Sequence, residues 1–154
     1  MKYPAIFVLA LALAGSAACK QGGSATGGGN HADSAQADKW TVYSGTLPCA
    51  DCSGIATELK LHEQANDPDY AFTLRETYQG VSNGKDQTFN SEGSYKIIHG
   101  NGGDKDAVII LLNPDKDRNL QRYFQKVSDT ELKQLDKDMR QVQSTLNYSL
   151  KSNQ

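Results

Sequence analysis

Residues 55–62 read Ile-Ala-Thr-Glu-Leu-Lys-Leu-His, so that odd positions are mainly apolar and even positions mainly polar. Side chains of a β-strand point alternately to the two faces of a sheet, so this period of two predicts a strand with one buried face. The pattern returns over residues 70–78, where the large apolar side chains are Tyr70, Phe72, Leu74 and Tyr78. Both runs favour strands over helices.

Further strand-like runs follow, separated by turn residues. Asn83-Gly84 predicts a tight hairpin, and Gly93 within the run 89–98 predicts a bulge or bend. Residues 107–112 are continuously apolar, as expected of a strand covered on both faces. We expect turns at 66–69, 80–86, 99–104 and 113–117, and later strands at 121–127 and 146–150.

One segment fits two structures. Leu132, Leu135 and Met139 have helical spacing, but residues 132–136 fit a short strand that enters a turn equally well.

Short strands joined by turns predict an all-β fold, a small antiparallel meander closed as a barrel. Residues 39–154 suffice for one domain with a single core. Closure would remove exposed strand edges. We expect the aromatic residues to belong to the core, namely Tyr70, Phe72, Tyr78, Phe89 and Tyr95.

The N-terminus reads as a targeting segment. Residues 1–18 contain Lys2, a short apolar stretch and the small residues that precede Cys19, which is typical of a bacterial lipoprotein signal peptide. Cys19 would then carry acyl chains such as palmitate, and Lys20 after it fits export to the outer membrane. Ordinary signal cleavage after Ala18 is the alternative. Residues 19–38 are rich in Gly and Ser and predict a flexible linker.

The composition excludes several classes of function. The formal net charge is −2 and no basic patch occurs, so we expect no nucleic acid as a partner. No glycine-rich phosphate loop, HExxH pair or GxSxG elbow is present, and we therefore expect a protein that is not an enzyme.

Residues 47–55 read Leu-Pro-Cys-Ala-Asp-Cys-Ser-Gly-Ile and place Cys49 and Cys52 in a turn ahead of a strand. A structural disulfide across so small a ring would contribute only about 2 kcal/mol. A thiol oxidoreductase normally has its first cysteine at a helix N-terminus, whereas here a strand follows. Two thiolates suit Cu(I), while zinc would need two further ligands. His62 and His99 are the only histidines of residues 39–154, and neither spacing predicts that they converge on the cysteines.

These residues resemble the N-terminal domain of the NlpE copper-resistance lipoproteins. The matching stretches are 43–55, with Leu59 and Leu61, then 78–80, Phe89 with Gly93, 132–136 and 146–150. The resemblance implies a lipocalin-like β-barrel on an outer-membrane lipid anchor, with roles in copper homeostasis, envelope-stress signalling and surface sensing. The turn after Asp136 usually contains a glycine, where this chain has Met139. The second, OB-like domain of the best-known member lies outside the resemblance.

The leading hypothesis is an outer-membrane lipoprotein, facing the periplasm or the cell surface and anchored in lipid through acylated Cys19. Its Cys49/Cys52 pair would sense redox state or bind copper, and its protein partner would be an envelope-stress sensor. The first alternative is a barrel that binds a small apolar ligand and has a merely structural disulfide. The second alternative is a thiol oxidoreductase.

Overall fold

The computed structural model describes residues 39–63, 70–101 and 103–153. The predicted signal peptide (1–18), the anchor at Cys19, the linker (19–38) and the turn at 66–69 lie outside these residues. No helix among the described residues has both the length and the apolar character needed to cross a membrane.

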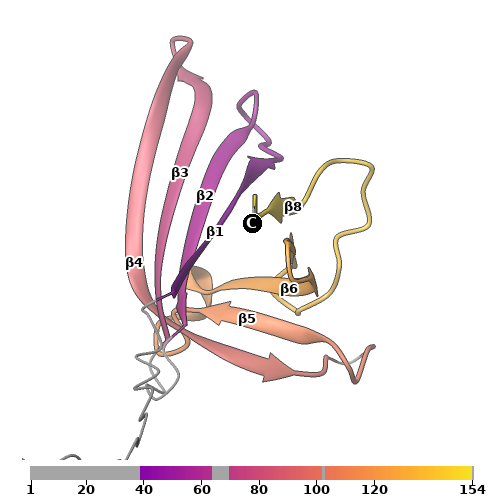
Figure 1. The fold of residues 1–154 in the computed structure, drawn as a ribbon. Coiled ribbons are helices and arrows are strands. Elements are labelled where there is room, and N and C mark those ends of the chain that lie inside the picture. The colour runs from indigo at the N-terminus through magenta and orange to yellow at the C-terminus, as the bar shows by residue number, and fades with distance from the viewer. Residues whose placement is uncertain (1–38, 64–69, 102, 154) are drawn as a thin grey trace, which may run out of the picture. The chain divides into compact units, whose positions relative to one another are not determined.

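The described residues form a closed antiparallel barrel in which each strand pairs with the next and β1 also pairs with β8 (Figure 1). The predicted all-β meander is therefore confirmed. The strands are β1 (Lys39–Leu47), β2 (Ile55–Glu63), β3 (Tyr70–Ser82), β4 (Lys85–His99), β5 (Val108–Leu112), β6 (Arg122–Ser128), β7 (Glu131–Gln134) and β8 (Ser149–Lys151). A single 3-10 turn, Arg118–Leu120, precedes β6.

The alternating residues of the first strands meet inside the barrel, as their pattern predicts. Leu59 lies opposite Leu74, and Leu61 lies opposite Phe72. Because these side chains share one face, they join a single inner core. Its buried members are Tyr43, Leu47, Leu59, Leu61, Phe72, Leu74, Tyr95, Ile110, Leu112, Phe124, Leu132 and Leu150.

Strand β5 is buried on both faces, as its continuous apolar run predicts. Ile110 belongs to the inner core, whereas the adjacent Ile109 belongs to a second cluster with Ala107, Tyr123 and Leu135. Exposed fractions are 6% for Ile110 and 0% for Ile109. The barrel wall is therefore covered from outside at β5 and β6.

The predicted bulge at Gly93 is wrong. The β3–β4 register runs without interruption through Phe72 opposite Gly93, and its shift lies between Tyr78 and Ser82. A Cβ at Gly93 would lie 2.5 Å from Asn113 Oδ1 and 3.1 Å from the Phe72 ring. Close packing against Phe72 and Asn113 therefore explains the glycine, while β4 as a whole does bend between its β3-paired and β5-paired parts (Figure 1).

Three other local predictions concern the turn at Asn83 and Gly84, residues 129–141 and the closing strand. The hairpin at Asn83 and Gly84 is confirmed, with φ values of 52° and 76°, both in the left-handed region that a type I′ turn needs. Over residues 129–141 the strand alternative holds, as β7 followed by a turn. The closing strand is shorter than predicted, and Leu146 lies outside it with 61% of its surface exposed.

The barrel does not remove every strand edge. Strand β4 pairs with β3 along most of its length, but with β5 only from Tyr95 to His99. Residues 85–93 therefore extend beyond β5, in the tall β3–β4 hairpin of Figure 1. Phe89 lies on this extension and is 49% exposed, so its predicted place in the core is wrong.

Candidate functional site

Cys49 and Cys52 lie in the loop between β1 and β2, residues 48–54, which we call the disulfide loop. The two sulfurs are bonded, and the Cα atoms lie 5.3 Å apart. Both cysteines are half-buried, whereas Ala50 and Asp51 between them are exposed. The disulfide is therefore in a position that a soluble reagent or another protein can reach.

The disulfide loop is held against β3. Ser53 donates its backbone N–H to the Gln79 carbonyl at 3.0 Å, and Gln79 donates to the Gly54 carbonyl at 3.0 Å. Gly54 also lets the loop pack closely on β1, because a Cβ there would lie 2.6 Å from Thr46 Cγ2. These bonds continue the β2–β3 ladder into the loop, so the cysteines sit on a fixed base.

The Cys52 sulfur lies 3.3 Å from the Gly54 carbonyl oxygen. A disulfide sulfur has no proton, so in the oxidised protein this contact is not a hydrogen bond. After reduction the Cys52 thiol would find an acceptor already in place.

The two histidines among the described residues, His62 and His99, lie far from the disulfide loop. His62 is seven residues along β2 from Ile55, about 23 Å away at about 3.3 Å per residue. His99 is the last residue of β4 and pairs with Val108, at the opposite end of that strand from the β3–β4 hairpin. Among the described residues, no three His, Cys, Asp or Glu side chains form a metal-binding group. A four-ligand zinc site is therefore not built around Cys49 and Cys52 in this part of the chain.

One charged residue lies on the inner face of β3, where sequence reasoning did not expect it. Glu76 shares the face of Leu74 and Tyr78, opposite Thr57 on one side and Phe89 on the other. Burial raises the pKa of Glu76 above its ordinary value of 4.5, while the positive charge of Arg122 acts in the opposite direction. The sequence did contain a signal for this: Glu76 occupies an inward position of the run 70–78, in which the other inward residues are apolar.

Glu76→Gln is expected to stabilise the protein at neutral pH and to remove part of its pH dependence. Because the folded-state pKa is raised, the folded protein keeps the proton over a pH window above 4.5 in which the unfolded chain has lost it. Stability from this group is therefore present below the window and is lost as pH rises through it. Urea unfolding of both proteins between about pH 4 and pH 7 measures this difference. Parallel stability curves for the two proteins would contradict the burial of Glu76.

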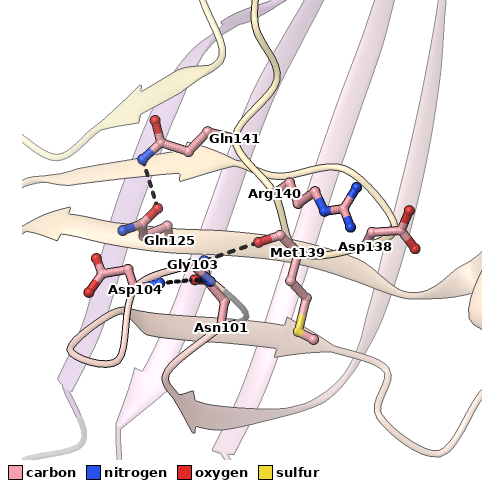
Figure 2. Close-up of a pocket in the computed structure, with 8 residues that line it drawn as sticks. All are labelled: Asn101, Gly103, Asp104, Gln125, Asp138, Met139, Arg140 and Gln141. Atoms are coloured by element: carbon pink, nitrogen blue, oxygen red, sulfur yellow. Dashed lines mark hydrogen bonds between the residues drawn. The ribbon is translucent and has the colours of Figure 1, made fainter.

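A separate cavity of about 410 Å³ lies outside the barrel, where the loop after β7 meets the β4–β5 turn and β6 (Figure 2). Met139, in this loop, has φ of 58°, a left-handed conformation that suits the glycine usual at this turn. Asn101 Nδ2 donates to the Met139 carbonyl at 3.2 Å, and Asp136 Oδ1 accepts the N–H groups of Asp138 and Arg140. The turn is thus held by several bonds, and Met139 packs on the outer cluster.

The chain matches one family of known proteins. No curated protein and no solved structure matches the chain. The model of the NlpE N-terminal domain family matches residues 43–145, which include the disulfide loop and extend from β1 to the segment before β8. Two thirds of the sequence thus follow one family pattern, and the chain belongs to the NlpE N-terminal domain family.

Proposed function

We propose that this protein is a non-enzymatic lipoprotein of the outer membrane whose Cys49/Cys52 pair serves in copper homeostasis and in sensing of envelope stress or surface contact. One observation carries the proposal: a reachable disulfide in a loop fixed to β3, within an NlpE-family barrel. Acylated Cys19 would anchor the chain in lipid. The linker of about 20 residues would span some 25 Å on average. An envelope-stress sensor protein is the proposed partner.

The redox part of the proposal follows from the size and position of the disulfide ring. The cysteines are separated by three positions, so the bond closes a small ring and contributes only about 2 kcal/mol by chain entropy. Reduction takes two electrons and two protons, supplied by a dithiol carrier of the envelope that becomes a disulfide itself. Because the barrel core does not depend on this bond, the loop can change redox state while the fold persists.

Copper fits the same residues only after reduction. The released pair supplies two soft thiolates in one loop, which is the ligand type that selects Cu(I). Cys49 and Cys52 would hold the ion, and the metal would supply a soft Lewis acid that links the two sulfurs. Ligand protons leave as the ion binds, so both protons of the reduced pair are released. Oxidation of the pair and copper binding would therefore exclude each other.

Two alternatives receive less support. The middle of the barrel is filled by buried side chains such as Leu59, Phe72 and Phe124, which speaks against an apolar ligand there. A thiol oxidoreductase needs an environment that favours a thiolate, such as a helix N-terminus. In the described part of the chain, the disulfide loop lies between two strands.

The test is a Cu(I) competition titration on the reduced full chain, with Cys19→Ser as the background so that only two thiols remain. We expect tight one-to-one binding in this background, because both ligands lie in one loop. Cys49→Ser and Cys52→Ser in the same background are each expected to weaken binding by at least about a hundredfold, through loss of one of two thiolate ligands. Alkylation of the reduced pair should abolish binding.

Equal weak binding by the background and both variants would remove copper from the proposal. The redox role would then be tested by equilibrating the pair with glutathione. A pair that stays fully oxidised at potentials near −300 mV would be structural, whereas a pair reduced at higher potentials would be a switch.

A further inference from the structure

Strand β4 has a free edge. Its residues 95–99 pair with β5, whereas residues 85–93 pair with β3 only. Every one of residues 85–93 is exposed. Among the residues that the structure describes, no strand lies along the second side of this segment, which we call the free edge.

The hydrogen bond at Ser94 shows toward which side of β4 the backbone N–H and C=O groups point. Asn113 donates its N–H to the Ser94 carbonyl at 2.9 Å, so Ser94 directs its backbone toward the β5 side. Backbone groups alternate between the two sides of an antiparallel strand. The pairing with β3 has no register shift between Gln87 and Tyr95. Thr88, Asn90 and Glu92 therefore present their N–H and C=O groups at the free edge.

The protection of the free edge consists of the charged side chains Lys85, Asp86 and Glu92 and of the register shift beside Asp86. Proteins normally blunt an exposed edge with proline, bulges or a covering segment, because unpaired backbone groups attract another strand. Residues 85–93 contain no proline, and the register shift of this hairpin lies beside Asp86, so that residues 87–93 pair with β3 without interruption. The free edge thus has the geometry of a surface for strand addition.

We propose that the free edge of β4 binds an extended segment of a partner protein as an added antiparallel strand, and that this segment carries basic residues on one face and apolar residues on the other. Main-chain hydrogen bonds to Thr88, Asn90 and Glu92 would supply the affinity. Side chains on the outer face of the added strand would meet Asp86 and Glu92. On the inner face they would meet Phe89, which is half-exposed and packs edge-on against Tyr78.

Charge disfavours pairing with a second copy of this chain in the register centred on Phe89. In an antiparallel self-pairing centred on Phe89, Asp86 of one copy lies opposite Glu92 of the other, and this happens twice. Like charges directly opposite each other destabilise a strand pair. Neither carboxylate has an ion pair within the described residues, so a basic strand would be favoured at the same positions. The proposal needs no thiol and stands apart from the function proposed for Cys49 and Cys52.

The test uses the unlipidated full chain, labelled with ¹⁵N, and a seven-residue peptide of alternating lysine and valine. We expect amide shifts confined to residues 85–93 and their neighbours on β3. The same peptide with N-methyl groups on the residues that face the edge should bind about tenfold more weakly, because it has lost main-chain donors. A glutamate–valine peptide should bind weakly to the wild type and better to Glu92→Lys.

The matched variants are Asn90→Pro and Asn90→Ala. Proline removes the N–H that faces outward, which an edge strand tolerates, and should weaken binding about tenfold, whereas alanine should leave it within about twofold. If Asn90→Pro does not fold, the test is the comparison of the N-methylated and unmethylated peptides on the wild-type protein. Equal binding of methylated and unmethylated peptides, or shifts that map elsewhere, would overturn the proposal. A dimer that forms through residues 85–93 would also overturn it, by assigning the edge to a second copy.

Discussion

Replacement of Phe124 by alanine is expected to lower the free energy of unfolding by about 3–5 kcal/mol. Phe124 is 1% exposed and lies in the inner core, where β6 pairs it with Ile110 on one side and Gln134 on the other. In an eight-stranded barrel the interior is just wide enough for side chains to fill. Neighbours fixed in the closed wall cannot collapse into the space, so most of the cavity would remain. Urea unfolding measures the loss.

The matched control is Val127→Ala on the same strand. Val127 is 53% exposed, so its truncation should change stability by no more than about 0.5 kcal/mol. A similar loss in both variants would contradict the placement of Phe124 inside the barrel. The comparison tests the assignment of faces along β6 as well as the size of the core.

Gly45→Ala is expected to open the barrel where β1 meets β8, with a loss of about 1–3 kcal/mol. A Cβ at Gly45 would lie 2.7 Å from the Ser149 carbonyl oxygen and 3.2 Å from Leu150 Cδ2. The backbone of β8 must move to admit it. The β1–β8 ladder has a single residue pair, Ser44 with Lys151, so the loss of this one pair would open the junction. Hydrogen exchange should rise in β8 more than in β2 and β3.

Gly84→Ala is the control for this prediction. Gly84 has φ of 76° and nothing within 4 Å of the added Cβ, so the cost is left-handed strain of about 1 kcal/mol without a clash. Hydrogen exchange at the β3–β4 turn should change, and that of β8 should not. Equal exchange in β8 for Gly45→Ala and the wild type would show that barrel closure does not depend on Gly45.

The local pattern of the sequence was sufficient to assign faces and strand types. Leu59, Leu61, Phe72 and Leu74 point inward because alternation is a property of the strand itself. The apolar run of β5 likewise predicts burial on both faces. The nearness of Cys49 and Cys52 along the chain brings their sulfurs within bonding range, although the sequence left their pairing open.

Other features depend on contacts between segments distant in sequence. The sequence predicted a bulge or bend at Gly93, but only the fold shows that the ring of Phe72 and the amide of Asn113 require its small size. Glu76 and Arg122 are 46 positions apart, and only the folded barrel brings their charges within reach of each other. Met139 has a left-handed conformation, and Asn101 from another loop donates a hydrogen bond to its carbonyl.

By itself the sequence determined that this chain is a meander of strands, which residues face inward, and that two thiols share one loop, because these follow from short-range spacing. Tertiary structure alone decided how far each strand extends past its neighbour. The β4 edge is free because β5 contains only Val108–Leu112, and that pairing depends on where the whole barrel closes. Short strands joined by turns predicted closure itself. Hydrogen bonds between strands are not encoded in the alternation of either strand, so the free edge could be known only from the fold.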